Sequence, residues 1–255
     1  MGDVMILFYI YVFMVGACVA SFINVVIDRL PKGISISKGR SRCDECKTQL
    51  KWYDLIPVVS WIMLRGRCRY CGSKIGLRTP LIELMGGSIA LICFNRYFMS
   101  PVVLLNFSLF MVLLAITFID IDTMTIPDEL VISVGILAII SIFVSDVTMI
   151  DRIIGFFCVS LPMLGICFIK DGAFGGGDIK LTAVLGFFMG YKLLLVGMFI
   201  AIVLAGIWAI FLLVTHNIKL QEHMAFGPFI CIGTFISELY GLTILIAYLS
   251  LFRLN

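Results

Sequence analysis

Charge is scarce in this 255-residue sequence, where only 14% of the residues are charged and 61% are hydrophobic. A soluble domain is roughly 45–50% apolar and about 25% charged. The chain therefore has too much apolar surface to bury in a water-soluble globule, which argues against a soluble enzyme, a secreted scaffold or a disordered chain. Basic residues are also missing before the first apolar run. We therefore expect that run to be a membrane span and not a cleaved signal peptide.

Long uncharged runs are abundant instead. A transmembrane helix needs about 20 mostly apolar residues to cross roughly 30 Å of hydrocarbon. We predict an all-α polytopic membrane protein with about eight transmembrane helices, at residues 4–27, 80–97, 101–119, 129–146, 153–170, 179–191, 193–216 and 226–252. The predicted domains are a first transmembrane helix over 1–27, a cytoplasmic basic loop over 28–79 and a membrane domain over 80–255.

The polar loop over residues 28–78 indicates the orientation. It holds 12 of the 19 Lys and Arg residues but 4 of the 16 Asp and Glu residues, a net charge of +8 (12 − 4). Short basic loops stay in the cytoplasm. With alternating spans, residues 120–128, 171–178 and 217–225 lie on the same side. Basic loops also occur in nucleic-acid-binding proteins, but beside a membrane the anionic inner leaflet is the favoured counter-charge. We therefore expect membrane lipids, and no nucleic acid, as partners.

Four cysteines form two CxxC pairs in this loop, Cys43 with Cys46 and Cys68 with Cys71. Two such pairs, with 21 residues between them, can supply four sulfur ligands to one tetrahedral zinc ion. The spacing predicts a structural Zn²⁺ site, the alternative being four reduced cysteines in a mobile loop. The loop has no histidine, and four sulfurs leave no open coordination position, which argues against catalytic zinc.

Acidic residues at two predicted span ends are the candidate catalytic groups, because ionisable side chains against a membrane are costly. The third span ends at Asp120 and Asp122, and Asp178 follows a run of three glycines, Gly175, Gly176 and Gly177. Two close carboxylates can hydrolyse a peptide bond, since one activates water while the other donates a proton. The glycines would let an extended substrate strand approach the backbone. The alternatives are a helix N-cap for Asp178, a solvated charge for Asp122 and an ordinary tight turn for the glycines.

Taken in order, these motifs resemble those of the type IV prepilin peptidases, also called prepilin leader peptidase/N-methyltransferases. Four blocks carry the resemblance over nearly the whole chain: residues 21–31, the two CxxC pairs, Ile119-Asp120 with Ile126-Pro127-Asp128, and residues 175–181. The family is similar to other GxGD membrane aspartyl proteases. The resemblance implies that residues 80–255 form a GxGD protease domain, in which Asp120 and Asp178 are the catalytic pair.

The resemblance also implies a substrate and a cofactor. The substrates would be prepilins or pseudopilins, cut after a short basic leader at the bacterial inner membrane, with the active site facing the cytoplasm. The new amino terminus would be methylated with S-adenosylmethionine, and the product would enter a type IV pilus or a type II secretion system. The S-adenosylmethionine site and the oligomeric state stay open. An ion-coupled membrane transporter and a non-catalytic zinc-loop assembly scaffold are the competing interpretations.

Overall fold

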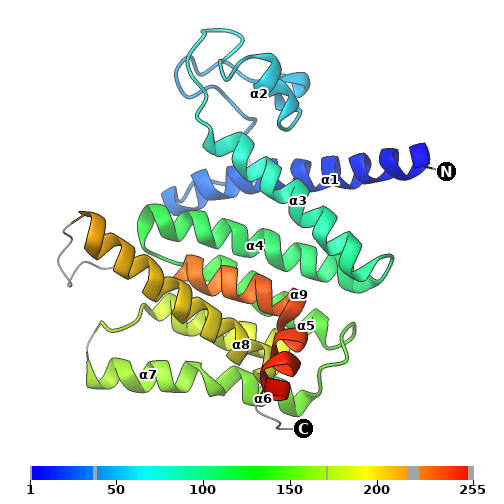
Figure 1. Ribbon diagram of the computed structural model, residues 1–255. Helices are drawn as coiled ribbons and strands as arrows, with labels where there is room; N and C mark the ends of the chain where they lie inside the picture. The colour runs from blue at the N-terminus through cyan, green and yellow to red at the C-terminus, as the bar shows by residue number, and fades with distance from the viewer. Residues whose placement is uncertain (1, 37–38, 171, 217–223, 252–255) are drawn as a thin grey trace. The chain divides into compact units, whose positions relative to one another are not determined.

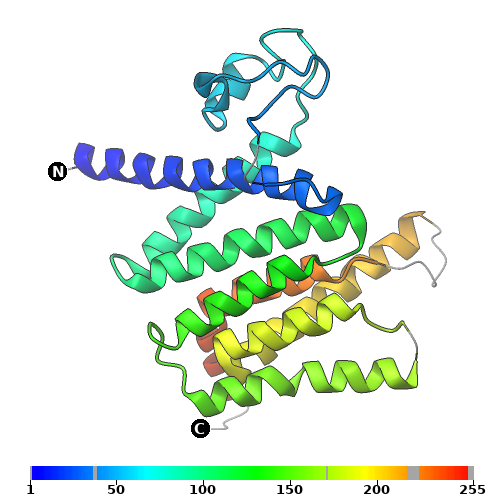
Figure 2. The same ribbon diagram turned by 180° about the vertical axis from the view of Figure 1, so that it is seen from behind.

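A computed structural model describes residues 2–36, 39–170, 172–216 and 224–251 (Figures 1 and 2). Within these ranges the chain is helical, and its β-type pairing is limited to two isolated bridges in the cysteine loop. The chain divides into two compact units between Met111 and Val112. Most of the predicted cytoplasmic segment 217–225, namely residues 217–223, lies outside the described residues.

The first unit contains the cysteine loop between two long helices. Its elements are α1 (Gly2–Arg29), η1 (Leu30–Lys32), η2 (Trp52–Leu55), α2 (Val59–Met63), α3 (Arg78–Tyr97) and the start of α4 (Pro101–Thr123). Both ribbon views show the loop leaving the end of α1 and returning to the start of α3. Pro101 is the first residue of α4, a position where the missing N–H of proline costs nothing.

Small residues allow α1 and α3 to pack closely. A Cβ atom on Gly16 would lie 2.5 Å from the Cβ of Ala90, and a Cβ on Gly86 would clash with Ala20. Small side chains at such crossings let membrane helices bring their backbones together. The two helices therefore form a closely packed base for the cysteine loop.

One buried carboxylate ties the loop to both helices. Glu83 of α3 is 6% exposed. Its Oε2 accepts the N–H of Val58 at 2.7 Å, and its side chain also bonds to that of Ser21 in α1. Val58 has a φ of 62° and a ψ of −50°, a positive-φ conformation that β-branched residues rarely adopt. The bond to Glu83 thus holds a strained turn of the loop on the α1–α3 pair.

The second unit is arranged around one central helix. After the end of α4 its elements are α5 (Asp128–Ser141), α6 (Met149–Cys158), α7 (Ser160–Ile169), α8 (Gly176–His216) and α9 (Gly227–Leu251). α8 packs against α5, α6 and α9. Its Leu181, Leu185 and Leu194 are almost fully buried, so the core of this unit lies along α8.

α8 contains a sharp break. Gly190 has φ 77° and ψ 167°, far from helical values. A Cβ on Gly186 would lie 2.8 Å from Cδ2 of Leu194, although a straight helix separates residues eight apart by about 12 Å. The chain therefore turns back at Gly190, next to the predicted boundary between the spans 179–191 and 193–216.

A buried arginine binds the ends of two helices in this unit. Arg152 of α6 is 0% exposed. It donates hydrogen bonds to the hydroxyls of Ser141 and Ser145 at 2.6 and 2.7 Å, and to the carbonyls of Phe187 and Phe188 at 2.9 and 3.1 Å. Carbonyls at helix C-termini lack partners within their own helix and favour a cation. α5 accordingly ends at Ser141, earlier than the predicted end at residue 146.

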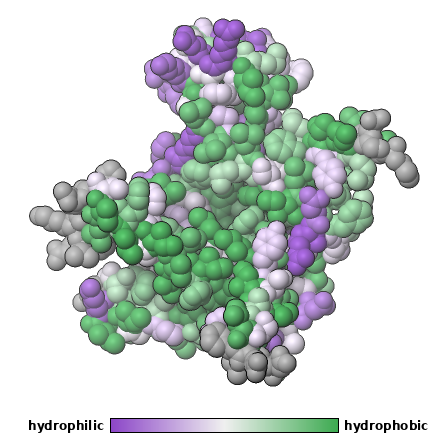
Figure 3. Space-filling model, viewed as in Figure 1, coloured by the Kyte–Doolittle hydropathy of each residue, from purple (hydrophilic) through white to green (hydrophobic). Residues whose placement is uncertain are grey.

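Among the residues that the structure describes, five helical segments are long and apolar enough to cross a membrane, by length and composition. They are Val4–Lys32, Pro101–Thr123, Met149–Ile169, Gly176–Thr215 and Gly227–Leu251. Figure 3 shows hydrophobic side chains over much of the visible surface of the helices, whereas hydrophilic ones gather on the cysteine loop of the first unit. The all-α class and the presence of membrane-length helices are confirmed. The count of eight spans stays a prediction. α5 has only 14 residues, and α8 forms one of the five membrane-length segments, where two spans were predicted.

Candidate active site and cysteine cluster

Asp120 is a buried carboxylate in the last turn of α4. Asp120 is 4% exposed, and its Oδ2 accepts the N–H of Gly227 at 3.0 Å. Gly227 is the first residue of α9, so this N–H has no partner within its own helix, and the positive end of the helix favours a negative group there. A Cβ on Gly227 would lie 2.6 Å from the same oxygen, so glycine permits this approach.

Asp122 has a different environment, although it is only two residues from Asp120. Residues two apart on a helix point about 200° away from each other. Asp122 is exposed, whereas Asp120 is buried. The structure therefore places Asp120 on the inner face of α4 and Asp122 on the outer face.

Asp178 is the third residue of α8 and is half-buried. Its carboxylate accepts the N–H of Gly175, just before the helix, which is the backward bond of a capping box. Asp178 thus caps α8 from within the first turn and is not the N-cap residue itself. Asp120 interacts electrostatically with Asp178, so the structure brings the two predicted carboxylates into one region of the second unit.

The three glycines before Asp178 have different surroundings. A Cβ on Gly175 would lie 3.1 Å from Oδ2 of Asp178, and one on Gly177 would lie 2.9 Å from Cβ of Ile126. A Cβ on Gly176 would have no heavy atom within 4 Å. Neighbouring atoms of the protein therefore leave little room for a side chain at Gly175 or Gly177, whereas the backbone of Gly176 borders open space.

The segment after α4 connects the parts of this site. Met124 has a φ of 53°, which turns the chain sharply at the end of the helix. Beyond this turn, Ile126 lies against Gly177, and its Cδ1 would be 3.3 Å from a Cβ on Gly227. Phe174 and Phe226, which precede α8 and α9, are also in ring contact at 6.1 Å. Segments more than 40 residues apart thus meet around the carboxylates.

An ion pair joins the first turns of α5 and α8. Nζ of Lys180 lies 2.8 Å from Oδ1 and 3.1 Å from Oδ2 of Asp128. Both side chains are more than half exposed, so the pair adds little stability. It does link the two motifs that carry the aspartates.

Gly227 contacts Asp120, although no sequence motif indicates this contact. Its position before Pro228 predicts only the start or a kink of the last span. Its contact with Asp120 joins residues 107 apart in the chain. The Gly-Pro pair at a helix start is the only local signal, and it does not indicate a partner.

The four predicted metal ligands form one cluster in the first unit. The sulfur atoms of Cys43, Cys46, Cys68 and Cys71 all lie within 4.8 Å of one another, and those of Cys43 and Cys71 are 3.8 Å apart. Two sulfurs bound tetrahedrally to zinc at about 2.3 Å are themselves about 3.8 Å apart. The four thiols can therefore hold one metal ion.

Each CxxC pair folds into the same turn. In both, the N–H of the first cysteine bonds to the carbonyl five residues later, as seen at Cys43 and Cys68. The residue four positions after that cysteine has a positive φ, 55° at Lys47 and 73° at Gly72. The first turn thus has a lysine in the conformation that glycine adopts more easily.

Hydrogen bonds favour the thiolate form at two of the four cysteines, Cys43 and Cys71. The N–H of Cys46 and then the hydroxyl of Ser73 lower the pKa of Cys43 to about 6. The Ser73 hydroxyl also lies 3.1 Å from the sulfur of Cys71, and it is the main cause that lowers the pKa of that thiol. Metal ions bind thiolates, so these contacts prepare the cluster for a cation.

Asp54 holds the second turn in place. Its Oδ1 accepts Nε–H of Arg69 at 2.7 Å, and its Oδ2 accepts the hydroxyl of Tyr70 at 3.0 Å. Burial opposes ionisation of Asp54, but the bonds from Arg69 and Tyr70 outweigh it and lower the pKa of the carboxyl. Burial, and then the bond to Asp54, raise the pKa of Tyr70 to about 12. The two residues between Cys68 and Cys71 are therefore anchored by one carboxylate.

Comparison with known proteins gives two family matches. The Bacterial Peptidase A24 N-terminal domain matches residues 14–97, and the Type IV leader peptidase family matches residues 107–210. The long apolar helices are typical of a helical membrane protein, and two acidic residues, Asp120 and Asp178, interact electrostatically at helix ends. The chain belongs to the type IV leader peptidase family.

Relatives in three bacteria carry the name prepilin leader peptidase/N-methyltransferase. The protein of Myxococcus xanthus (strain DK1622) is 36% identical over 197 residues, 74% of this chain and 58% of the relative. That of Aeromonas salmonicida (strain A449) is 29% identical over 96% of this chain and 94% of the relative. That of Bacillus subtilis (strain 168) is 29% identical over 94% and 97%. No solved structure matches significantly.

Proposed function

We propose that this protein is a membrane aspartyl endopeptidase that removes the short basic leader from type IV prepilins or pseudopilins. The observation that carries the proposal is the meeting of two carboxylates at helix ends. Asp120 is buried and held by the N–H of Gly227, and its charge acts on Asp178. Membership of the leader peptidase family and the names of the relatives support this activity.

The two carboxylates divide the hydrolysis between them. Close carboxylates do not both ionise readily, so the pair holds one proton. The ionised group takes a proton from a water molecule, whose oxygen attacks the carbonyl carbon of the scissile peptide bond. The protonated group then gives its proton to the leaving amine. The bond from Gly227 holds Asp120 in place for this step, and Asp178 lies in the first turn of α8.

The glycine run is the proposed contact for the extended substrate around the scissile bond. Gly175, Gly176 and Gly177 offer backbone without side chains, and Gly176 has open space where a Cβ would be. Gly176→Ala meets no atom of the protein, so we expect a loss of cleavage only if substrate occupies this space. Normal cleavage by Gly176→Ala would contradict the contact at that residue.

The proposed membrane arrangement has eight crossings with the aspartates at the cytoplasmic face of the bacterial inner membrane. The reversal at Gly190 supports counting α8 as two spans. α3 and α5 complete the count. The net charge of +8 on residues 28–78 supports a cytoplasmic cysteine loop.

We also propose a second activity and a structural metal. The relatives' names support N-methylation of the new amino terminus, with S-adenosylmethionine as the methyl donor. The spacing of the four thiols and the lowered pKa of Cys43 and Cys71 fit a structural Zn²⁺ ion. When bound, such an ion cross-links the two CxxC turns and adds to the stability of the loop. The family matches do not favour a transporter or a non-catalytic scaffold.

The test is cleavage of a purified prepilin in liposomes, with mass spectrometry reporting the cut and any added methyl group. We expect Asp120→Asn and Asp178→Asn to lose cleavage with their folds intact. Asp122→Asn is the matched control, because it makes the same change two residues away on the exposed face of α4. Full cleavage by the first two variants would overturn the aspartyl mechanism. Loss in Asp122→Asn in place of Asp120→Asn would move the catalytic position.

A further inference from the structure

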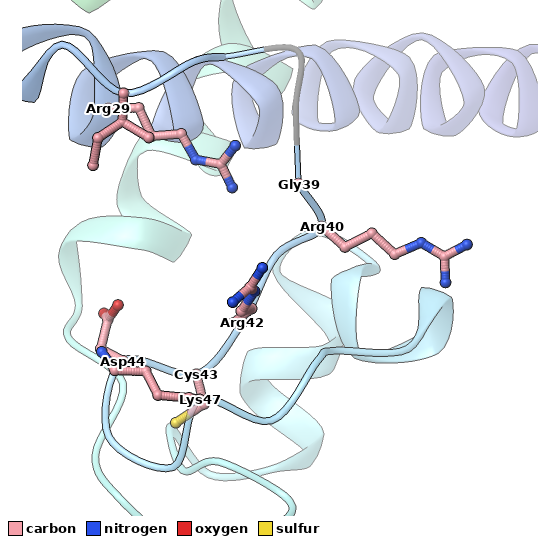
Figure 4. Close-up of a pocket in the computed structure, with 8 residues that line it drawn as sticks. Arg29, Gly39, Arg40, Arg42, Cys43, Asp44 and Lys47 are labelled. Carbon is pink, nitrogen blue, oxygen red and sulfur yellow. The ribbon is translucent and has the colours of Figure 1, made fainter.

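A pocket of about 340 Å³ lies where α1 passes into the cysteine loop of the first unit. Its wall includes Arg29, the last residue of α1, and three basic residues of the loop, Arg40, Arg42 and Lys47. In Figure 4 the guanidinium groups of Arg29 and Arg42 point toward the space between the helix and the loop, whereas that of Arg40 points aside. The proposed peptidase chemistry uses none of these side chains.

The charge of this pocket suits an anion. Four cationic residues and one carboxylate, Asp44, line it, a net charge of +3 (4 − 1). Arg40 can donate to the side-chain oxygen of Gln49 at 3.1 and 3.2 Å, whereas Arg42 and Lys47 are exposed to solvent. Guanidinium groups match the oxygens of a phosphate with paired hydrogen bonds, and an ammonium adds a point charge. A phosphate group is therefore the ligand chemistry that fits.

The position of the pocket along α1 indicates where that phosphate comes from. Residues 4–27 of the helix carry no charge, and Arg29 follows two residues later. Arg29 therefore marks the level at which hydrocarbon gives way to water and headgroups. A pocket walled by Arg29 lies at the depth of the lipid phosphates.

Exposed apolar side chains on the same loop support a lipid source. Trp52 is 78% exposed, Ile62 63% and Met63 76%. Segments that lie on a membrane surface combine such side chains with lysine and arginine. We propose that the pocket binds the phosphate of an anionic phospholipid headgroup and so docks the cysteine loop on the inner leaflet. The lipid proposal rests on the proposed cytoplasmic orientation of the cysteine loop, and not on the peptidase activity.

The test uses the full-length protein in detergent, titrated with dihexanoyl phosphatidylglycerol or dihexanoyl phosphatidylcholine. Native mass spectrometry counts lipids retained on the intact protein. Each cation near an anionic lipid surface contributes about a fivefold gain in affinity. We expect the double variant Arg42→Gln, Lys47→Gln to bind phosphatidylglycerol about 25-fold more weakly than wild type. The matched control, Arg65→Gln with Lys74→Gln, removes two charges from the same loop outside the pocket and should bind as wild type.

A variant that strengthens binding separates the proposal from misfolding. Asp44→Asn removes the one carboxylate of the pocket and should raise the affinity for phosphatidylglycerol about fivefold. Equal affinity in the two double variants would overturn the site, and so would equal binding of phosphatidylcholine. Competition by inorganic phosphate at the lipid's own concentration would assign the pocket to a soluble phosphate compound and overturn the lipid source. Prepilin cleavage is measured on the same variants, so that a change in lipid binding can be told apart from a change in peptidase activity.

Discussion

The close approach of Gly227 to Asp120 predicts the effect of adding a single methyl group. Gly227→Ala places a Cβ 2.6 Å from Oδ2 of Asp120, whereas ordinary contacts begin at 3.4 Å. The carboxylate or the start of α9 must therefore move by about 0.8 Å (3.4 − 2.6). A displacement near 1 Å in a catalytic site costs on the order of 10²-fold in rate. We expect kcat for prepilin cleavage to fall about 100-fold, or about 2.7 kcal/mol, with little change in KM.

The backbone at Gly227 makes this substitution a clean steric test. Its φ is not in the left-handed range, so alanine can adopt the same backbone conformation. Gly206→Ala in α8 is the matched control, because a Cβ there would have no heavy atom within 4 Å. We expect that control to cleave prepilin at the wild-type rate.

The assay is the initial rate of leader removal by both variants. Thermal unfolding measures the amount of folded protein in each sample, and the rates are compared at equal amounts. A Gly227→Ala variant that is folded and cuts within threefold of wild type would refute the contact as a determinant of the site. An equal loss of rate in Gly206→Ala would assign the effect to general helix packing and would also contradict a specific role for the contact between Gly227 and Asp120.

Three further predictions concern stability and thiol chemistry. Arg152→Met leaves two hydroxyls and four carbonyls without their donor and should cost about 3–5 kcal/mol in denaturant unfolding. Arg96→Met, at an exposed arginine, should cost almost nothing, and equal costs would contradict the network. Lys47→Gly relieves a left-handed φ of 55° and should stabilise the loop by about 0.5–1 kcal/mol. The measurement is the rate at which the protein loses metal to a chelator, which should fall. A faster loss of metal from the variant would contradict the proposed backbone strain at Lys47. After metal removal, alkylation of Cys43 should have its midpoint near pH 6, because a lowered pKa keeps the thiolate above that pH and loses it below. Ser73→Ala should move the midpoint upward, and a wild-type midpoint above pH 8 would contradict the hydrogen bonds.

The helical elements were largely predictable from local features. Uncharged runs of membrane length indicate helices, and prolines and acidic residues mark where they begin. Pro101 and Asp128 start α4 and α5 close to the predicted positions. The end of α5 was wrong by several residues, because it depends on Arg152, which lies in another helix and binds the carbonyl end of α5.

Hydropathy and spacing alone do not distinguish Asp120 from Asp122, and the choice of Asp120 rests on the family resemblance. Both Asp120 and Asp122 follow the same apolar span, and hydropathy does not say which face of α4 is turned inward. The packing of α9 decides this, because its first N–H meets Asp120. The same holds for the three glycines, which look equivalent in the chain but have different neighbours.

Local features of the sequence are enough to predict the class of protein, most of the helices and the residue types of the candidate site. Composition, periodicity and short motifs are local properties, and they need no knowledge of distant contacts. Which side chains come into contact depends on the fold, since those contacts join residues far apart in the chain. The bond from Gly227 to Asp120, the reversal at Gly190 and the gathering of four thiols all depend on how the helices and the loop pack. Packing depends on the summed shape of many side chains, which no single motif encodes.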